Sequence, residues 1–450
     1  MKKSISIVLL LTAIASADTP PTPTGPTTSS TAGQPGALVL TLQQALDIAA
    51  RQQPSLRQSK ATAEAAAARV DQSKVILHPT ASLGASLGTG SKSPHACVAA
   101  DGTASTCGGG YFTAGLSTGL SAQASWRIYD FGLTQANIRA AEASAVAAAA
   151  GIDTTVLDIR KSVESAYFEA VARARLIKVA EATVTSEEGH LDQARRFVAA
   201  QAKDPIEVAQ AQARAANARS ALAQARSNEA VALANLRAAI GWIDATHSPV
   251  VEGSWPEPSV ELPELTAMVE TARKNRPEIV QLDKQILAAD ASLSAAHLEQ
   301  RPVLSASAQT AWAPNDNDWS PQPTWSAGIS LTWPILDGGK SKADVRLANA
   351  NLAGAVAARD ALLVSLTSQL DSARAQIVAN RANVQASTEA VDAAKSQLHL
   401  ADGRYAQGLG SQIELADAQT AVTTAEGNLV LAEYELADAW AQLRRALGQI

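Results

Sequence analysis

Two short motifs in the sequence match motifs of enzyme active sites, and both favour a structural explanation. Residues 115–119, GLSTG, have the spacing of a hydrolase nucleophile elbow, in which a serine lies on a sharp turn between a strand and a helix. Here the serine lies within an alternating strand pattern that no helix follows. Residues 130–132, DFG, match a kinase tripeptide, but DGG at 337–339 stands at the equivalent place in a repeat, which indicates a turn. We therefore predict that the chain is not an enzyme.

The residues that could bind a metal are few and poorly spaced. None of the six histidines is paired with another at i and i+4, the spacing that places two ligands on one helical face. Cys97 and Cys107 are the two cysteines of the chain. In an exported protein two neighbouring cysteines most often form a disulfide, which we predict here as a structural bridge. A metal site with His95 is the alternative; we predict no metal and no cofactor.

The N-terminus has the pattern of a secretory signal. Two lysines precede an apolar run and the small-residue cleavage site ASA at 15–17. We predict a signal peptide over 1–17 and a flexible Pro- and Thr-rich lead-in over 18–39. Loss of the two lysines changes the net charge from −6 to −8. A chain with this negative charge does not have the basic surface that binds nucleic acid, so we predict no nucleic-acid partner. The mature chain has no run of 18 apolar residues, so we predict no membrane-spanning helix.

The rest of the chain is a tandem repeat. Nine residues recur in the same order, two pairs at a separation of 223 and the others at 207, so the first copy holds 16 extra residues between Pro79 and Trp126. Repeat units usually cannot bury their apolar faces alone, so the copies are expected to pack together. The recurring pairs are Pro54/Pro277, Pro79/Pro302, Trp126/Trp333, Asp130/Asp337, Gly132/Gly339, Arg139/Arg346, Ile206/Ile413, Glu207/Glu414 and Gly241/Gly448.

Each copy follows the order helix, β-hairpin, long helix, turn and return helix. We place the first repeat at 40–241 with its hairpin at about 80–128, and the second at 264–450 with its hairpin at about 303–334. Residues 242–263 form a Pro-rich linker. The long helices are about 95 Å long at 1.5 Å per residue. Their Ala-rich seams, with charged residues between, favour close helix packing of coiled-coil type.

The strands alternate large apolar residues with Ser, Thr, Gly and Gln, which suits a wall between lipid and water. Within a bilayer every strand edge must be paired, so four strands need partners from other chains. Two copies would give an eight-stranded barrel, and side chains fill the interior of a barrel of that size. Three copies give twelve strands, which can enclose water. Long helices that extend from such a barrel would form a tube through an aqueous space. The pattern therefore predicts a duct.

The whole mature chain resembles the TolC family of outer-membrane efflux and secretion ducts. The similarity lies in the order of elements, in LDGG at 336–339 before a long helix, and in RYAQGLGSQIELADAQTAV at 404–422. The resemblance implies a mainly α fold with transmembrane β: a trimeric 12-stranded outer-membrane barrel, four strands per chain, continued by a long α-helical barrel across the periplasm. It also implies docking of a periplasmic adaptor and an inner-membrane pump at the helical tip.

The resemblance assigns roles to residues near the turns between long and return helices. Glu414 and Asp417 lie three apart, hence on one helical face, and align with an acidic ring at the closed aperture. In a trimer six carboxylates would attract cations; a solvated helix start, where acids are favoured anyway, is the alternative. Tyr405 aligns with a tyrosine that helps to close the aperture, whereas Gly410 stands where the pattern has an arginine.

Two further sets of residues follow from the same comparison. Gly408 and Leu409 match the glycine-containing tip to which adaptors bind, although an ordinary helix C-cap would look the same. In the first copy Ala200 stands where a glycine is expected, with one extra residue before the return helix. Phe197 and Glu207 are expected to line the tip.

We therefore expect a homotrimeric, passive channel in the outer membrane, in contact with its lipid and extending into the periplasm. It would belong to a tripartite efflux or type I secretion system and open when adaptor and pump spread the tip helices. A secreted structural or adhesive coiled-coil trimer is the main alternative. A periplasmic adaptor is a second, which the strand pattern disfavours.

Overall fold

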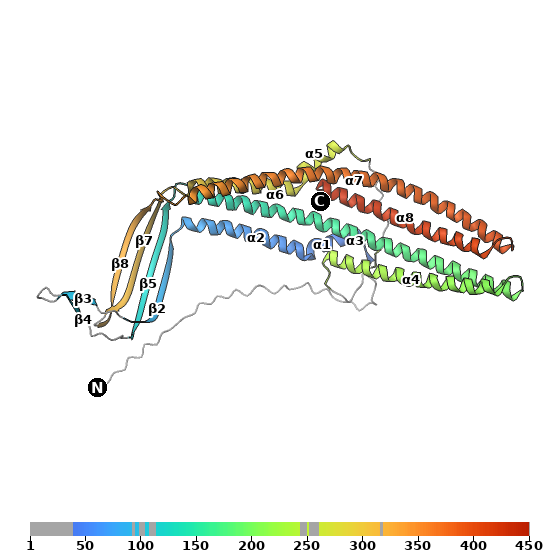
Figure 1. The fold of residues 1–450 in the computed structure, drawn as a ribbon, viewed down its shortest axis with the longest axis horizontal. Coiled ribbons are helices and arrows are strands. Elements are labelled where there is room, and N and C mark those ends of the chain that lie inside the picture. The colour runs from blue at the N-terminus through green and yellow to red at the C-terminus, as the bar shows by residue number, and fades with distance from the viewer. Residues whose placement is uncertain are drawn as a thin grey trace, which may run out of the picture.

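The protein is described by a computed structural model that covers residues 39–91, 95–98, 104–107, 114–243, 250–251, 261–315 and 318–449, with side chains except at 39, 89–117 and 313–322. Figure 1 shows an elongated molecule with a curved sheet at one end and two pairs of long antiparallel helices at the other. The predicted signal peptide and the lead-in up to residue 38 lie outside the described residues, as do the side chains of Cys97 and Cys107 with their predicted bridge; Val39, the last residue of the predicted lead-in, begins β1.

The helices repeat in length as well as in order. The long helices α3 and α7 have 67 residues each, about 100 Å at 1.5 Å per residue, and the return helices α4 and α8 have 36 each. None of the described helices has a stretch that is long and apolar enough to cross a membrane. The bounds are α1 Leu42–Gln52, α2 Pro54–Lys74, a 3-10 turn Val75–Leu77, α3 Leu133–Ala199, α4 Pro205–Ile240, α5 Leu265–Asn275, α6 Pro277–Leu298, α7 Lys340–Ala406 and α8 Gln412–Leu447.

The recurring prolines and glycines meet at the middle of the molecule. Pro54 begins α2 and so separates it from α1, because proline disfavours helix at the residue before it. Gly241 ends α4 in the left-handed conformation (φ 72°), and a Cβ there would lie 2.9 Å from the Cα of Gln53 in the break. In the second copy Gly448 meets Asn275 at the α5–α6 break with the same 2.9 Å approach. Each return helix therefore docks, through a glycine, on the break of its own first helix.

The four long strands form one antiparallel sheet in the order β2-β5-β7-β8, so β5 and β7 join the two copies. The edge strands β2 and β8 have no further strand partner among the described residues. Two short pairs accompany the sheet: parallel β1–β6 beside the helices and antiparallel β3–β4 beyond the sheet. The bounds are β1 Val39–Leu40, β2 Thr80–Ser91, β3 His95–Val98, β4 Ala104–Cys107, β5 Ala114–Tyr129, β6 Val250–Val251, β7 Val303–Asn315 and β8 Asp318–Thr332.

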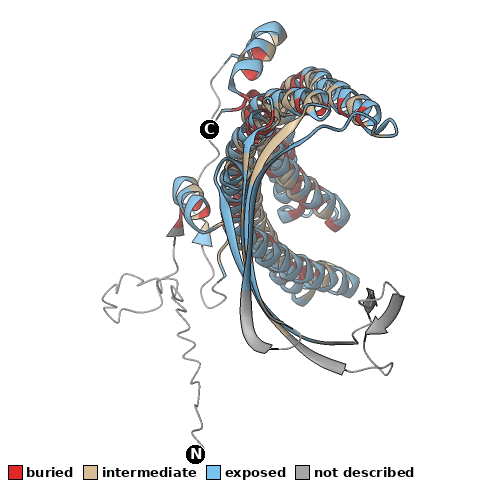
Figure 2. Cartoon of the chain, turned by 90° about the vertical axis from the view of Figure 1, so that its left-hand side faces the viewer, coloured by how far each residue is buried: buried red, intermediate tan, exposed pale blue. Residues whose placement is uncertain are grey.

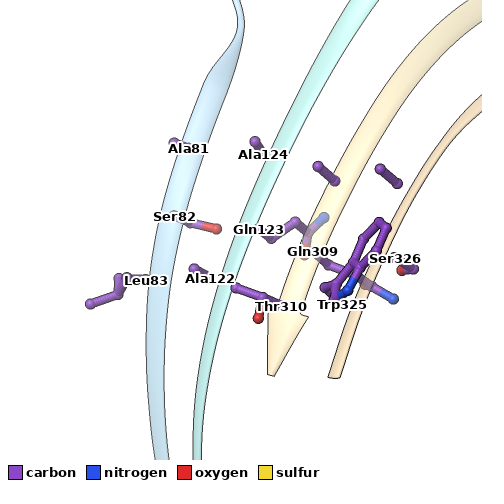
Figure 3. A pocket seen from close by; sticks show the side chains of 12 residues that line it. Ala81, Ser82, Leu83, Ala122, Gln123, Ala124, Gln309, Thr310, Trp325 and Ser326 are labelled. Carbon is purple, nitrogen blue, oxygen red and sulfur yellow. The ribbon is translucent and has the colours of Figure 1, made fainter. Parts of the chain in front are cut away.

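One face of this sheet is apolar and uncovered. Leu83 on β2 and Trp325 on β8 are both 80% exposed, although side chains of this kind are usually buried. Figure 3 shows them on either side of small residues such as Ala122 on the strands between. They border a shallow groove of about 490 Å³. The register places Gln123 opposite Gln309, in positions that point to the other face. An apolar surface of this extent indicates contact with lipid or another protein.

The strand-to-helix junctions are built alike in both copies. Asp130 accepts hydrogen bonds from the main-chain and side-chain groups of Thr134 at the start of α3, and Asp337 does the same for Ser341 at the start of α7. Burial alone would raise the pKa of Asp130, but these bonds outweigh it and lower the pKa. The Ser341 hydroxyl is the main cause that lowers the pKa of Asp337 to about 2. The two DxG motifs are therefore helix caps.

The buried residues lie between helices rather than in the sheet, as the colours of Figure 2 show. One core joins α1, α3, α4 and β1 around Val163, Tyr167 and Phe168; a second joins α5, α7 and α8 around Leu366 and Leu370. Alanine supplies many of the buried positions, which lets the long helices approach closely.

Candidate functional site at the helix turns

The two turns at the far end of the long helices have the same backbone. In each, the N–H of the residue five positions on donates to a carbonyl of the last helical turn, at 2.9 Å from Ala202 to Phe197 and from Leu409 to Arg404. This is the Schellman arrangement, which places one residue in the left-handed region. That residue is Gly408 in the second turn, with φ of 74°.

The expected place of Ala200 is wrong by one residue. The left-handed residue of the first turn is Gln201, with φ of 56°, whereas Ala200 has φ of −79°. Both turns have the same length, so the first contains no extra residue, and the separation of 207 that relates the copies holds through the turn. Placing Ala200 at the glycine position sets Phe197 opposite Tyr405, whereas the separation of 207 relates Phe197 to Arg404.

Tyr405 lies at the centre of a contact between the two copies. Its side chain is fully buried, and its hydroxyl donates to Oε2 of Glu207 at 3.0 Å. Its ring meets that of Phe197 edge to face, with centroids 5.7 Å apart. Gln412 adds a 2.9 Å bond from its Nε2 to the main-chain oxygen of Glu207. We call Phe197, Glu207, Tyr405 and Gln412 the tip cluster.

The environment of Tyr405 keeps its phenol protonated. Burial, together with the hydrogen bond to the Glu207 carboxylate and the negative charge of that group, raises the pKa of Tyr405 to about 12. The neutral phenol is therefore a dependable hydrogen-bond donor at physiological pH.

The predicted acidic pair lies apart from this cluster. Glu414 and Asp417 are both exposed, on the first turns of α8. Oε1 of Glu414 pairs with Nε of Arg404 at 3.1 Å, and the main-chain N–H of Glu414 donates to the capping hydroxyl of Ser411. Arg404 offsets one of the two negative charges, so these three side chains carry a net charge of −1 per chain.

The predicted docking residues are at the surface of the second turn. Gly408 is exposed, and a Cβ there would meet nothing within 4 Å. Leu409 is 69% exposed, and Ile413 on the next helix is 64% exposed. Two large apolar side chains are therefore exposed near the glycine of this turn. Gln412, which we did not predict, is buried because it reaches across to the first copy.

A row of polar contacts connects the tip cluster to the middle of the molecule. It runs along α3 and α8, which lie antiparallel, and we call it the α3–α8 ladder. Ion pairs stand at its middle end and neutral hydrogen bonds at its tip end. Its pairs, in order toward the tip, are Asp158–Arg445 (2.9 Å), Glu164–Arg444 (2.7 Å), Ser165–Asp438, Arg175–Glu433 (2.7 Å), Thr183–Thr423 (2.9 Å) and Ser186–Gln419 (2.7 Å).

In the part of the chain that the structure describes, no group of three or more His, Cys, Asp or Glu side chains is arranged to hold a metal ion. What the site offers chemically is hydrogen bonding and charge between two helical hairpins.

The sequence and the fold are similar to those of known proteins. Residues 45–242 and 268–449 match the family model described as outer membrane efflux protein. The chain is 27% identical to Protein CyaE of Bordetella pertussis over 91% of this chain and 84% of that one, and 23% identical to Nodulation protein T of Rhizobium leguminosarum bv. trifolii over 75% and 72%. Among solved structures, the CmeC outer membrane channel of Campylobacter jejuni superposes with a TM-score of 0.77 at 18% identity, over 90% of this chain and 85% of that one.

These matches confirm the predicted fold, that of TolC-like trimeric channels in which a β-barrel continues into a helical barrel. They give no support to the structural or adhesive alternative. The matched family consists of channels rather than enzymes. With its two repeats covered by the family model and its apolar sheet and long helices in place, the chain belongs to the outer membrane efflux protein family, as an outer-membrane channel that extends into the periplasm.

Proposed function

We propose that three copies of this chain assemble into one passive duct, in which twelve strands close a barrel through the outer membrane. The observation that carries this proposal is the four-stranded sheet, with an uncovered apolar face and with edges, β2 and β8, that pair with no further described strand. In a bilayer those edges must be paired, and β2 of one copy with β8 of the next satisfies both. Three such seams give the twelve strands that enclose water.

The test of the duct is its assembly and conductance. Protein purified in detergent is expected to have the mass of three chains by native mass spectrometry and to conduct ions in planar lipid bilayers once its tip is open. A monomer that dissolves in buffer without detergent would contradict the proposal.

We infer that the tip cluster is the latch that keeps the duct closed. Tyr405 at the end of α7 and Glu207 at the start of α4 join the two helical hairpins of one chain, and both are largely shielded from water. If the hairpin of α7 and α8 moves outward to open the aperture, this bond and the one from Gln412 must break. The α3–α8 ladder supports an outward movement that begins at the tip, because its contacts near the tip are neutral hydrogen bonds, which are weaker than the ion pairs at its middle end.

The acidic residues fit a cation-attracting aperture of modest strength. Glu414 and Asp417 from three chains provide six carboxylates, offset by three copies of Arg404. Replacing both acids by Ala is expected to lower the single-channel preference for cations and the block by divalent cations. Unchanged selectivity and block would reject their role at the aperture.

We further propose that a periplasmic adaptor docks on the second turn and couples the duct to an inner-membrane pump. Gly408 leaves open space at the turn, and Leu409 and Ile413 offer apolar side chains beside it. A Leu409→Glu variant is expected to lose adaptor capture in vivo by crosslinking, while it still assembles. The matched control is Leu400→Glu, at a similarly exposed leucine on α7 away from the turn. Equal capture by both variants would contradict this docking surface.

A further inference from the structure

The first turn places a cation beside the tip cluster. Nζ of Lys203 lies 3.5 Å from Oε1 of Glu207, while Oε2 of the same carboxylate accepts the bond from Tyr405. The same ammonium lies 5.4 Å from the centre of the Tyr405 ring, within the range of a cation–π contact. Lys203 therefore touches both partners of the bond that joins the two hairpins.

The repeat shows why this cation comes from the first copy. Lys203 and Gly410 are 207 residues apart, so they occupy the same position in the two turns. Gly410 is buried, and a Cβ there would lie 3.0 Å from the main-chain nitrogen of Tyr405 and 3.2 Å from the carbonyl carbon of Arg404. A side chain at 410 would need the turn to shift. The second turn thus has no room for a cation at this position, and the first turn supplies one.

The shielding of this ion pair distinguishes it from the others at the tip. The side chains of Lys203 and Glu207 are 22% and 17% exposed, against 57% and 43% for Arg404 and Glu414. Charges that are less hydrated attract each other more strongly, and exposed pairs contribute little. The pair beside Tyr405 is therefore the one at which loss of a charge has the larger effect.

We propose that Lys203 is the positioning residue of the closed latch: it orients the Glu207 carboxylate toward the Tyr405 hydroxyl and holds the Tyr405 ring through its charge. This proposal rests on the tip cluster being the latch. Lys203 acts on Glu207 and on the ring, and it needs no contact with cargo.

The test compares single-channel records in planar bilayers of the full-length channel, four single variants and one double variant. Lys203→Met removes the charge and keeps much of the length, and it is expected to raise the open probability about fivefold, the change that ~1 kcal/mol produces. Lys203→Arg is expected to remain closed, because it restores the charge. Lys395→Met is the matched control, since Lys395 on α7 forms an ion pair with Glu426 on α8, inside the second hairpin and away from its turn.

The fourth variant, Tyr405→Phe, separates this proposal from the latch itself. If Tyr405→Phe opens the channel and Lys203→Met does not, the latch stands and the role of Lys203 is overturned. If neither opens it, the latch is wrong and the role of Lys203 falls with it. In the double variant, Lys203→Met with Tyr405→Phe, the increase in open probability is expected to be smaller than the product of the two single increases. Both substitutions act on the same carboxylate, so their effects are not independent. An increase equal to that product would contradict the claim that Lys203 and Tyr405 act on the same carboxylate.

Discussion

Glu164 on α3 and Arg444 on α8 form a 2.7 Å ion pair across 280 residues of sequence, with the Glu164 side chain 3% exposed. Arg160 pairs with the same carboxylate at 3.2 Å. A buried carboxylate between two arginines is the least exposed ion pair of the α3–α8 ladder, and it lies near the middle of the molecule. It fixes the place where the second hairpin is attached to the first copy.

Glu164→Ala is expected to lower the free energy of unfolding by about 3 kcal/mol, because it leaves two arginines without their shared carboxylate. This is the low end of the range for broken buried pairs, since both arginines remain partly exposed. Denaturant unfolding of the detergent-solubilised protein measures it. Thr183→Val, which removes a neutral bond nearer the tip, is the control and should cost about 1 kcal/mol. Equal losses would contradict a ladder that is strongest at its middle end.

Hydrogen exchange should report the same gradient as motion. Main-chain amides of 412–423 on α8 are expected to exchange faster than those of 433–445, because local opening follows the weaker contacts. Ser186→Ala should accelerate exchange at 412–423 and leave 433–445 unchanged, since Ser186 bonds Gln419. Mass spectrometry of peptic fragments measures both regions in one experiment. Uniform exchange along α8 would exclude opening from the tip.

The two turns allow a matched stability test. Gln201→Gly is expected to stabilise the protein by about 1 kcal/mol, because a left-handed φ is strained for a residue with a Cβ. Gly408→Ala should destabilise it by a similar amount, since a Cβ there meets no neighbour and the cost is conformational alone. Thermal unfolding of both variants decides the point. A stabilising Gly408→Ala would show that the turn changes conformation.

Alkaline pH should open the latch. The pKa of Tyr405 is raised to about 12 from an ordinary value of 10, so the folded state holds this proton more tightly than the unfolded state. The stabilisation is complete below pH 10 and is lost as the pH rises toward 12, where the phenolate can no longer donate to Glu207. Single-channel conductance is expected to rise over that interval. Tyr405→Phe should lack this step, and a step that persists in it would assign the titration to another group.

The repeat made most of the fold predictable. Alternation of apolar and small polar residues indicated the strands, and the repeat indicated the same order of elements in both copies; the structure contains strands and helices in that order. The docking of Gly241 and Gly448 on the breaks was not predicted, because nothing in a single sequence says which distant segment meets a glycine. The recurrence of these residues was the available signal, and close approach is its physical cause.

The tip was predicted less well, for a related reason. Tyr405, Glu207 and Phe197 were named one by one from resemblance, and the structure brings the three together. Lys203 and Gln412 were missed, because their roles depend on contact between turns about 200 residues apart. Counting 207 from Gly410 leads to Lys203, and that separation would also have placed Gln201, rather than Ala200, at the left-handed position.

The hydrogen bond between Tyr405 and Glu207 joins the two repeats within one chain. Each subunit of the proposed trimer therefore carries its own closing contact. Because each of the three contacts is intramolecular, one subunit can break its Tyr405–Glu207 bond while the bonds of the other two remain intact. Partly engaged complexes would then pass current in discrete sublevels, in steps of one third of the ring.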